Sequence, residues 1–189
     1  MTPMSVGLIR LAALSLLALA VIAQVGTASP RAALVEEVRR ATARFSDVAA
    51  AGKAGYAPFL GCVSGPQEGA MGVHYVNDAL VGDGVVDAQQ PEALMYEAKD
   101  GRLRFVGVEY IVLAEAWNAR HKTPPTLMGQ VFHFTPSPNR YGIPAFYALH
   151  VWAWKHNPNG AFVDWNPKVS CEEFTEALVT ASSAHGGRH

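Results

Sequence analysis

The sequence predicts an α+β domain: a mainly antiparallel, twisted sheet or partial barrel with an N-terminal and a C-terminal helix. Three observations lead to this fold class. Apolar residues recur at helical spacing near the two ends of the body. The middle holds four or five short runs rich in β-branched and aromatic residues, without long helices between them. An Asp-Gly pair at 100–101 joins two of these runs as in a β-hairpin.

Residues 1–28 have the pattern of a secretory signal peptide. Arg10 precedes an apolar run over 11–23, and small residues follow it, so that cleavage after Ala23 or after Ala28 fits. The run is short for a membrane span, and an uncleaved anchor is the alternative. No later stretch is long and apolar enough to span a bilayer. We therefore expect an exported protein, periplasmic or extracellular, with no stable membrane span after cleavage.

The body is expected to be a single domain over 29–181, followed by a frayed tail over 182–189. Ser29 is a good N-cap and Pro30 suits the first helical position, so an amphipathic helix should follow over 31–51. Residues 56–70 read as irregular because proline and glycine interrupt them. The remaining expected elements are strands at 71–77, 92–97, 103–113, 129–135 and 144–155, a helical turn at 114–119, and a helix capped by Ser170 that runs to about 179.

Composition and motifs exclude several classes of function. The formal net charge is -1 and the basic residues are scattered, whereas a nucleic-acid surface shows clustered ones. The chain has no CxxC motif and no paired Cys/His spacing, which argues against a zinc finger, a thioredoxin-type site and c-type haem attachment. It also lacks a G-x-S-x-G elbow and a glycine-rich phosphate loop.

The two cysteines, Cys62 and Cys171, are expected to form a disulfide. In an oxidising compartment a lone cysteine pair is most simply a cystine. Two free buried thiols are the alternative.

Four polar residues stand alone inside apolar strands, each in a different predicted strand: His74, Glu109, His133 and His150. Side chains from adjacent strands on one face approach closely enough to share a ligand. Three imidazoles and a carboxylate suit a divalent transition metal: zinc, copper, iron or manganese. The alternatives are hydrogen-bonded core positions, or polar groups that line a pocket for a small organic molecule.

Several segments carry distinctive motifs: GCVSGP at 61–66, GAMGVHYVN at 69–77, VGVEY at 106–110, GQVFH at 129–133 and LHVWAWKHNPNG at 149–160. Together they cover most of the body after the first helix. They resemble a family of exported, mostly bacterial proteins without an assigned activity. The resemblance implies a shared fold and export, and it identifies no catalytic residues in this chain.

Two functions are therefore expected from the sequence. The first is an exported protein with a metal site formed by three histidines and one glutamate, which includes a metal-dependent enzyme of unknown reaction. The second is a non-catalytic extracellular or periplasmic domain that binds a small ligand or serves a structural role.

Overall fold

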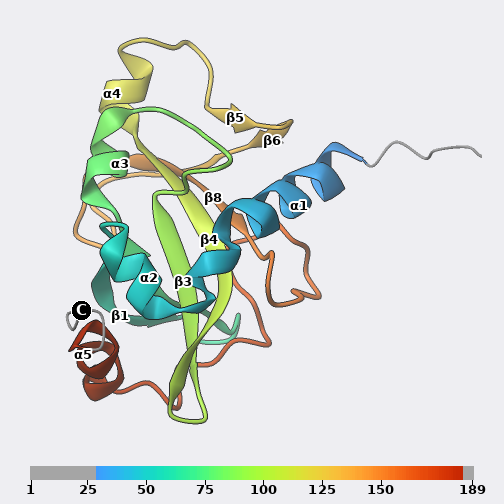
Figure 1. The fold of residues 1–189 in the computed structure, drawn as a ribbon. Coiled ribbons are helices and arrows are strands. Elements are labelled where there is room, and N and C mark those ends of the chain that lie inside the picture. Colours follow the sequence, from blue (N-terminus) through green and yellow to red (C-terminus); the bar gives the residue numbers. More distant parts are fainter. Residues whose placement is uncertain (1–28, 185–189) are drawn as a thin grey trace, which may run out of the picture.

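The computed structural model describes residues 29–184, which form a curled six-stranded antiparallel sheet with helices packed against it (Figure 1). The strand order in the sheet is β1-β2-β3-β4-β8-β7. The bounds are β1 Ala57–Ser64, β2 Ala70–Val76, β3 Ala93–Lys99, β4 Arg102–Leu113, β7 His133–Thr135 and β8 Phe146–Val151. Strands β5 (Thr126–Leu127) and β6 (Gln130–Val131) form a separate small hairpin. The predicted α+β class with a twisted, partly closed sheet is confirmed.

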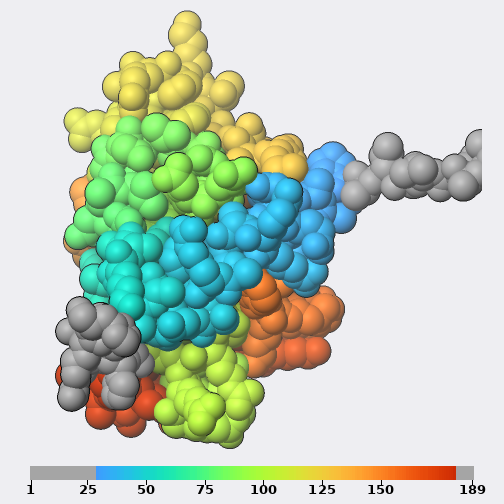
Figure 2. All heavy atoms as spheres, in the orientation of Figure 1, coloured from blue at the N-terminus to red at the C-terminus, as the bar shows by residue number. Residues whose placement is uncertain are grey.

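Helices α1 and α2 cover one face of this sheet, in front of it in Figures 1 and 2. The helical elements are α1 Pro30–Thr42, the 3-10 turn η1 Ala43–Ser46, α2 Val48–Lys53, α3 Asp78–Asp83, α4 Ala114–Asn118 and α5 Glu176–Ala184. Between residues 29 and 184, none of these helices has the length and apolar character needed to cross a membrane. The predicted signal peptide lies outside the described residues.

The expected helix over 31–51 is divided into three parts. Its start is as predicted, because the Ser29 side chain accepts a hydrogen bond from the Ala32 N–H at 3.3 Å. The break falls at Asp47, whose backbone is extended and whose carboxylate accepts from the Ala49 N–H to begin α2. Aspartate side chains compete for backbone donors in this way, which favours a new cap over a continuous helix.

Residues 57–64 form strand β1, although proline and glycine led us to expect an irregular segment. β1 is an edge strand, where Pro58 removes no donor that the sheet needs. The pairing with β2 shifts between Phe59 and Cys62, and Leu60 has a φ of 57° in this bulge. Proline and a bulge are common at sheet edges, so the same residues fit a strand of this kind.

The hairpin at 100–101 is confirmed. Asp100 and Gly101 have φ angles of 52° and 68°, the left-handed values that a two-residue hairpin turn requires. The sheet is also covered on both faces, since residues 106–112 of β4 are all buried. The alternate positions of this strand are mostly apolar on both faces, which is the sequence pattern of such a strand.

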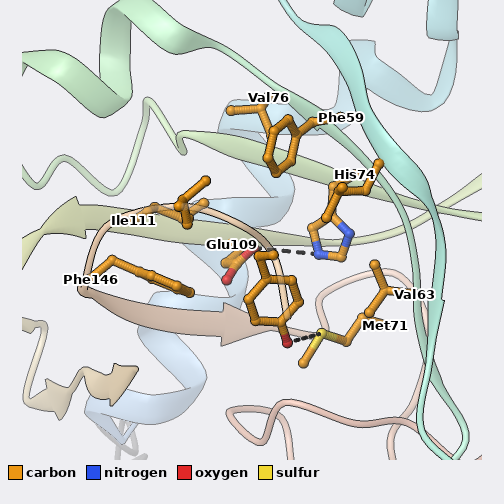
Figure 3. Close-up of a pocket in the computed structure, with 11 residues that line it drawn as sticks. Phe59, Val63, Met71, His74, Val76, Glu109, Ile111 and Phe146 are labelled. Atoms are coloured by element: carbon orange, nitrogen blue, oxygen red, sulfur yellow. Dashed lines mark hydrogen bonds and ion pairs between the residues drawn. The ribbon is translucent and has the colours of Figure 1, made fainter. Parts of the chain in front are cut away.

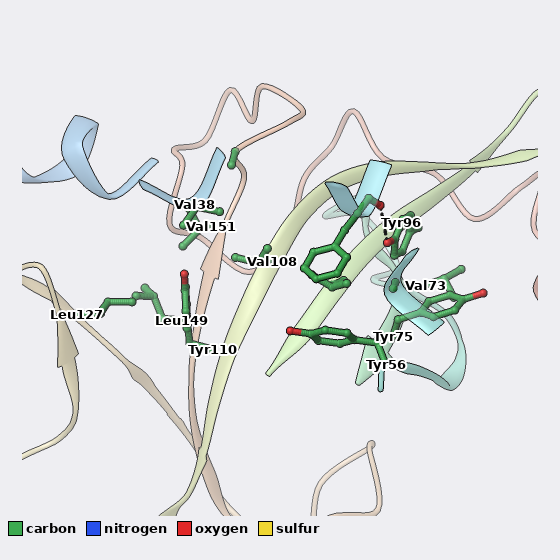
Figure 4. Packing of buried hydrophobic residues seen from close by; sticks show 14 of the residues in the cluster. Val38, Tyr56, Val73, Tyr75, Tyr96, Val108, Tyr110, Leu127, Leu149 and Val151 are labelled. Atoms are coloured by element: carbon green, nitrogen blue, oxygen red, sulfur yellow. Dashed lines mark hydrogen bonds between the residues drawn. The ribbon is translucent and has the colours of Figure 1, made fainter. Parts of the chain in front are cut away.

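The two faces of the sheet carry different cores. The helix-side core holds a tyrosine cluster in which the rings of Tyr75 and Tyr96 meet at 5.2 Å, and the Tyr96 hydroxyl donates to the Phe45 carbonyl (Figure 4). The second face, away from α1 and α2, is covered by loops and by the edge of β1. Its apolar residues fall into two smaller clusters, one around Trp152 and one around Ile111. His74, Glu109 and His150 are buried on this second face.

The predicted strand over 144–155 is too long at both ends, because β8 covers only Phe146–Val151. The alternation between the two faces of the sheet is lost only at Trp154, beyond the end of β8. Trp152 stays in the second-face core, whereas the Trp154 indole donates to the Thr42 hydroxyl of α1 on the helix side. The expected strand at 129–135 is likewise divided between β6 and β7.

The last helix starts at Glu176, six positions after the expected cap at Ser170. The Ser170 hydroxyl does accept from the Glu172 N–H. However, the next carboxylate, Glu173, accepts from the Lys99 ammonium at 2.8 Å and from the Asp100 N–H at 2.6 Å. These contacts hold the segment against the β3–β4 turn, so the helix begins after it.

The predicted disulfide is present between Cys62 and Cys171, which lie 109 positions apart in the sequence. It joins the edge strand β1 to the segment before α5. The described residues contain no free cysteine.

A buried carboxyl at Glu92 is expected to make stability fall as the pH rises. Burial raises the pKa of Glu92 to about 8, although its carboxylate accepts from the Ile111 N–H at 2.9 Å. The unfolded carboxyl has an ordinary pKa near 4.5, so the native state binds the extra proton between pH 4.5 and 8. Stability from this proton is complete below pH 4.5 and is lost as the pH rises to 8.

Glu92→Gln removes this titration and keeps the side-chain oxygen that Ile111 uses. The free energy of unfolding of the variant, relative to the unmodified protein, should increase by up to about 4 kcal/mol between pH 5 and pH 8. Denaturant unfolding at a series of pH values measures this difference. Other titrating groups are common to both proteins, so a difference that stays constant with pH would contradict the assignment.

Candidate metal centre

Three strands bring the candidate ligands together. Glu109 on β4 pairs directly with His150 on β8, so their side chains leave the same face. His74 on β2 lies on the far side of β3. On β3, Met95 pairs with His74 and Ala93 pairs with Glu109, so the two candidate ligands lie diagonally across this strand. Both of these side chains are long enough to meet across the curled sheet.

The three side chains converge in a buried cluster. The distance from Glu109 Oε2 to His74 Nε2 is 3.4 Å, and Glu109 Oε1 lies 3.7 Å from His150 Nε2 (Figure 3). One ligand atom from each residue can be chosen so that all lie within 4.8 Å of one another. The residues are 6%, 7% and 2% exposed for His74, Glu109 and His150 respectively. Two imidazoles and one carboxylate therefore face a common point from which bulk water is largely excluded.

Within this cluster, His150 is the residue whose ring nitrogens lack hydrogen-bond partners. Both of its ring nitrogens are buried without a hydrogen-bond partner among the described residues. A buried polar atom without a partner is costly, and native proteins rarely keep one without a reason. The distances from Glu109 to both histidines are also longer than good hydrogen bonds. The cluster lacks the close internal bonding of a purely structural polar core.

Asp164 lies behind His150 on the loop that leads to the last helix. Its Oδ1 is 3.3 Å from His150 Nδ1, although the angles are not those of a hydrogen bond. The same oxygen is 3.1 Å from His133 Nδ1 and does form a hydrogen bond there. The loop is held by the Trp152 indole, which donates to the Val163 carbonyl at 2.6 Å. A carboxylate behind a histidine is the usual arrangement that orients a metal-binding imidazole.

His133, the fourth candidate, is placed outside the cluster. Its side chain is 54% exposed and contacts Asp164 rather than Glu109. Strand β7 is short, and His133 pairs with Ala148, two positions from His150. It therefore shares the face of the cluster but lies at the sheet edge. Asp164 takes the inner position, although it lies in a loop and was not among the candidate ligands predicted from the sequence.

Competing electrostatic effects act on the cluster. Burial, with a further effect of His150, lowers the pKa of His74 to about 3, so this ring is neutral near pH 7. Burial disfavours a charge on His150, but Glu109 and Asp164 outweigh it and raise the pKa of His150. Burial raises the pKa of Glu109, against the influence of His150. A bound cation would stabilise the Glu109 carboxylate and the neutral imidazoles together, because these are the ligating forms.

The pKa of Asp164 is shifted in the opposite direction to the pKa of Glu109. Burial disfavours its carboxylate, but His150 and His133 outweigh this effect and lower the pKa of Asp164. Asp164 therefore stays ionised, and its Oδ1 lies 3.3 Å from His150 Nδ1. If the proton of a neutral His150 ring were on Nδ1, beside this carboxylate, Nε2, the nitrogen nearest Glu109, would keep its lone pair.

An apolar chamber opens beside the cluster, and His74 and Glu109 form part of its wall (Figure 3). Its volume is about 40 Å³. Strand β1 contributes Phe59, Leu60 and Val63 to the wall. The bulge in β1 thus forms one side of the chamber, although this strand was not expected from the sequence.

Comparisons with protein families, with curated proteins and with solved structures each find no match. The function is therefore inferred from the geometry of the cluster and the chamber.

Proposed function

We propose that this protein is an exported metal-binding protein in which His74, Glu109 and His150 hold one divalent transition metal. The convergence of these side chains at a buried point carries the proposal, together with the ring nitrogens of His150, which have no hydrogen-bond partner within residues 29–184. Two histidines and one carboxylate form the protein ligand set of zinc hydrolases and of non-haem iron oxygenases.

Three protein ligands leave coordination positions for water or a small ligand, which is the property that separates catalytic from structural zinc sites. The chamber borders two of the three proposed ligands, His74 and Glu109, so a small molecule in it would lie beside the metal. The proposal therefore includes a metal-dependent enzyme, and Asp164 supports His150 in it as a positioning residue.

Export is supported by three observations. The disulfide between Cys62 and Cys171 is a bond that persists in oxidising compartments. The pattern over 1–28 is that of a signal peptide. The motifs at 69–77 and 149–160 resemble those of an exported family.

The second candidate function is a non-catalytic domain that binds a small ligand without a metal. The chamber itself favours it, because a largely apolar pocket with a few polar groups is the general form of a small-molecule site. In this case His74 and Glu109 would act only as hydrogen-bonding groups in the wall.

Metal content decides between the two functions. Protein purified without an affinity tag should contain about one transition-metal ion per chain by elemental analysis. Removing the metal with a chelator should lower the melting temperature, and adding it back should restore it, because a ligand that binds only the native state stabilises that state. A protein that takes up no zinc, iron(II), manganese(II) or copper(II), and gains no thermal stability from them, would refute the metal site.

A further inference from the structure

The chamber beside the metal centre is closed mainly by apolar side chains from separate elements. Phe59 and Val63 come from β1, Val76 from β2, Ile111 from β4 and Ile143 from the segment before β8. Figure 3 shows Val76, Ile111 and Phe59 around the space that His74 and Glu109 also border. A ligand that reaches a metal from this side would have apolar groups around it.

The polar groups of the wall are few, and none of them is a lysine or an arginine. Besides His74 and Glu109, the wall has the hydroxyl of Tyr141, which contacts the Met71 sulfur at 3.8 Å. The neighbouring Arg140 is already engaged, since it donates to the Ser64 carbonyl at 3.0 Å and lies 5.7 Å from the Trp165 ring centre. An anionic tail would find no cation here, and a sugar would leave most of its hydroxyls without partners.

The volume of the chamber limits the size of the ligand. A cavity of about 40 Å³ exceeds the roughly 10–15 Å³ that one buried water needs, but it is small beside the roughly 300–1,000 Å³ of a site for a drug-sized ligand. The ligand is therefore expected to be a molecule of a few non-hydrogen atoms.

We propose that the chamber takes a small, uncharged, mainly apolar molecule that offers a single donor atom to the metal. The coordination part of this inference depends on the proposed metal centre, whereas the apolar uptake follows from the chamber alone. Two measurements test these parts separately.

The first measurement uses xenon and the metal-free protein, because an apolar cavity takes up this gas without any metal. Methyl NMR signals of Val63, Val76 and Ile111 should shift under xenon pressure. Filling the chamber with Ile143→Trp, or with Val76→Phe if the first variant does not fold, should abolish the shifts. Val131→Trp places the same ring on an exposed position of β6 as the matched control and should leave them unchanged.

The second measurement uses the cobalt(II)-loaded protein and a series of nitriles that share one donor atom. The visible spectrum of cobalt reports their binding. Propionitrile should bind about fourfold more tightly than acetonitrile, because its extra methylene group is buried in the chamber. Benzonitrile should bind more weakly than propionitrile because it exceeds the available space. In Ile143→Trp the advantage of propionitrile should disappear.

The outcomes separate the two proposals. Cobalt binding without xenon uptake, or with equal affinities for the two aliphatic nitriles, would overturn this inference and leave the metal centre intact. Xenon uptake without cobalt binding would refute the metal centre, and with it the coordination of the ligand. Xenon uptake, cobalt binding and the predicted order of nitriles would support both.

Discussion

Replacing His150 by alanine is expected to abolish stoichiometric metal binding and to weaken the affinity by more than about a hundredfold. The variant removes one of the three proposed protein ligands, whereas changes in groups that only support a ligand typically cost 10- to 100-fold. His150 is 2% exposed, so folding of each variant must be checked by circular dichroism. Titration of the metal-free proteins with zinc or cobalt measures the affinities.

Matched variants test how the loss of metal affinity depends on the position of the replaced residue. Asp164→Asn should weaken metal binding by about 10- to 100-fold, because Asp164 orients His150 without reaching the cluster. His133→Ala should cost less than either, since its exposed ring contacts only Asp164. His121→Ala, on an exposed ring stacked against Trp117, should have no effect. A loss of metal in His133→Ala as large as in His150→Ala would contradict the three-ligand centre and favour the four-ligand site expected from the sequence.

Removing the disulfide with Cys62→Ala and Cys171→Ala together is expected to lower the free energy of unfolding by about 5 kcal/mol. The bond closes a segment of 109 positions, and the chain-entropy estimate for a loop of this length is about 4.8 kcal/mol at 25 °C. This loss is a large fraction of the total free energy of unfolding of a typical domain, which is about 5–15 kcal/mol.

Urea unfolding of the double variant and of the oxidised protein measures this difference. The chemically reduced form of the unmodified protein serves as the control, because it breaks the same bond without changing the residues. Both should unfold at similarly reduced urea concentrations. A loss below about 1 kcal/mol in the double variant would show that the bond adds little beyond the packing of β1.

The sequence predicted the elements whose signals are local. The hairpin at Asp100-Gly101, the Ser29 cap and the two-sided burial of β4 each follow from residues close together in the chain. β1 was not predicted because a proline such as Pro58 is tolerated in an edge strand but not in a central strand. Only the strand order of the folded sheet shows that β1 lies at the edge. The start of α5 likewise depends on Glu173 reaching a turn more than 70 positions away.

The candidate site was likewise predicted only as far as local signals in the sequence allow. Lone polar residues inside apolar strands correctly identified His74, Glu109 and His150 as a group that comes together. Convergence could not be derived from the pattern, because it depends on the strand order and on the curl of the sheet. His133 carried the same signal as the others, but its strand lies at the sheet edge, where Asp164 from a distant loop occupies the inner position.

If the proposed metal centre is correct, the pairing of β4 with β8 would determine when the protein can acquire a metal. Glu109 and His150 meet only through this pairing, and the chain between them passes through α4 and three short strands. A nascent chain that has not yet added β8 carries an incomplete ligand set. In the proposed centre, metal loading would therefore follow completion of the sheet, in whichever compartment the chain folds. The metals available there, together with intrinsic affinity, would decide which ion occupies the centre.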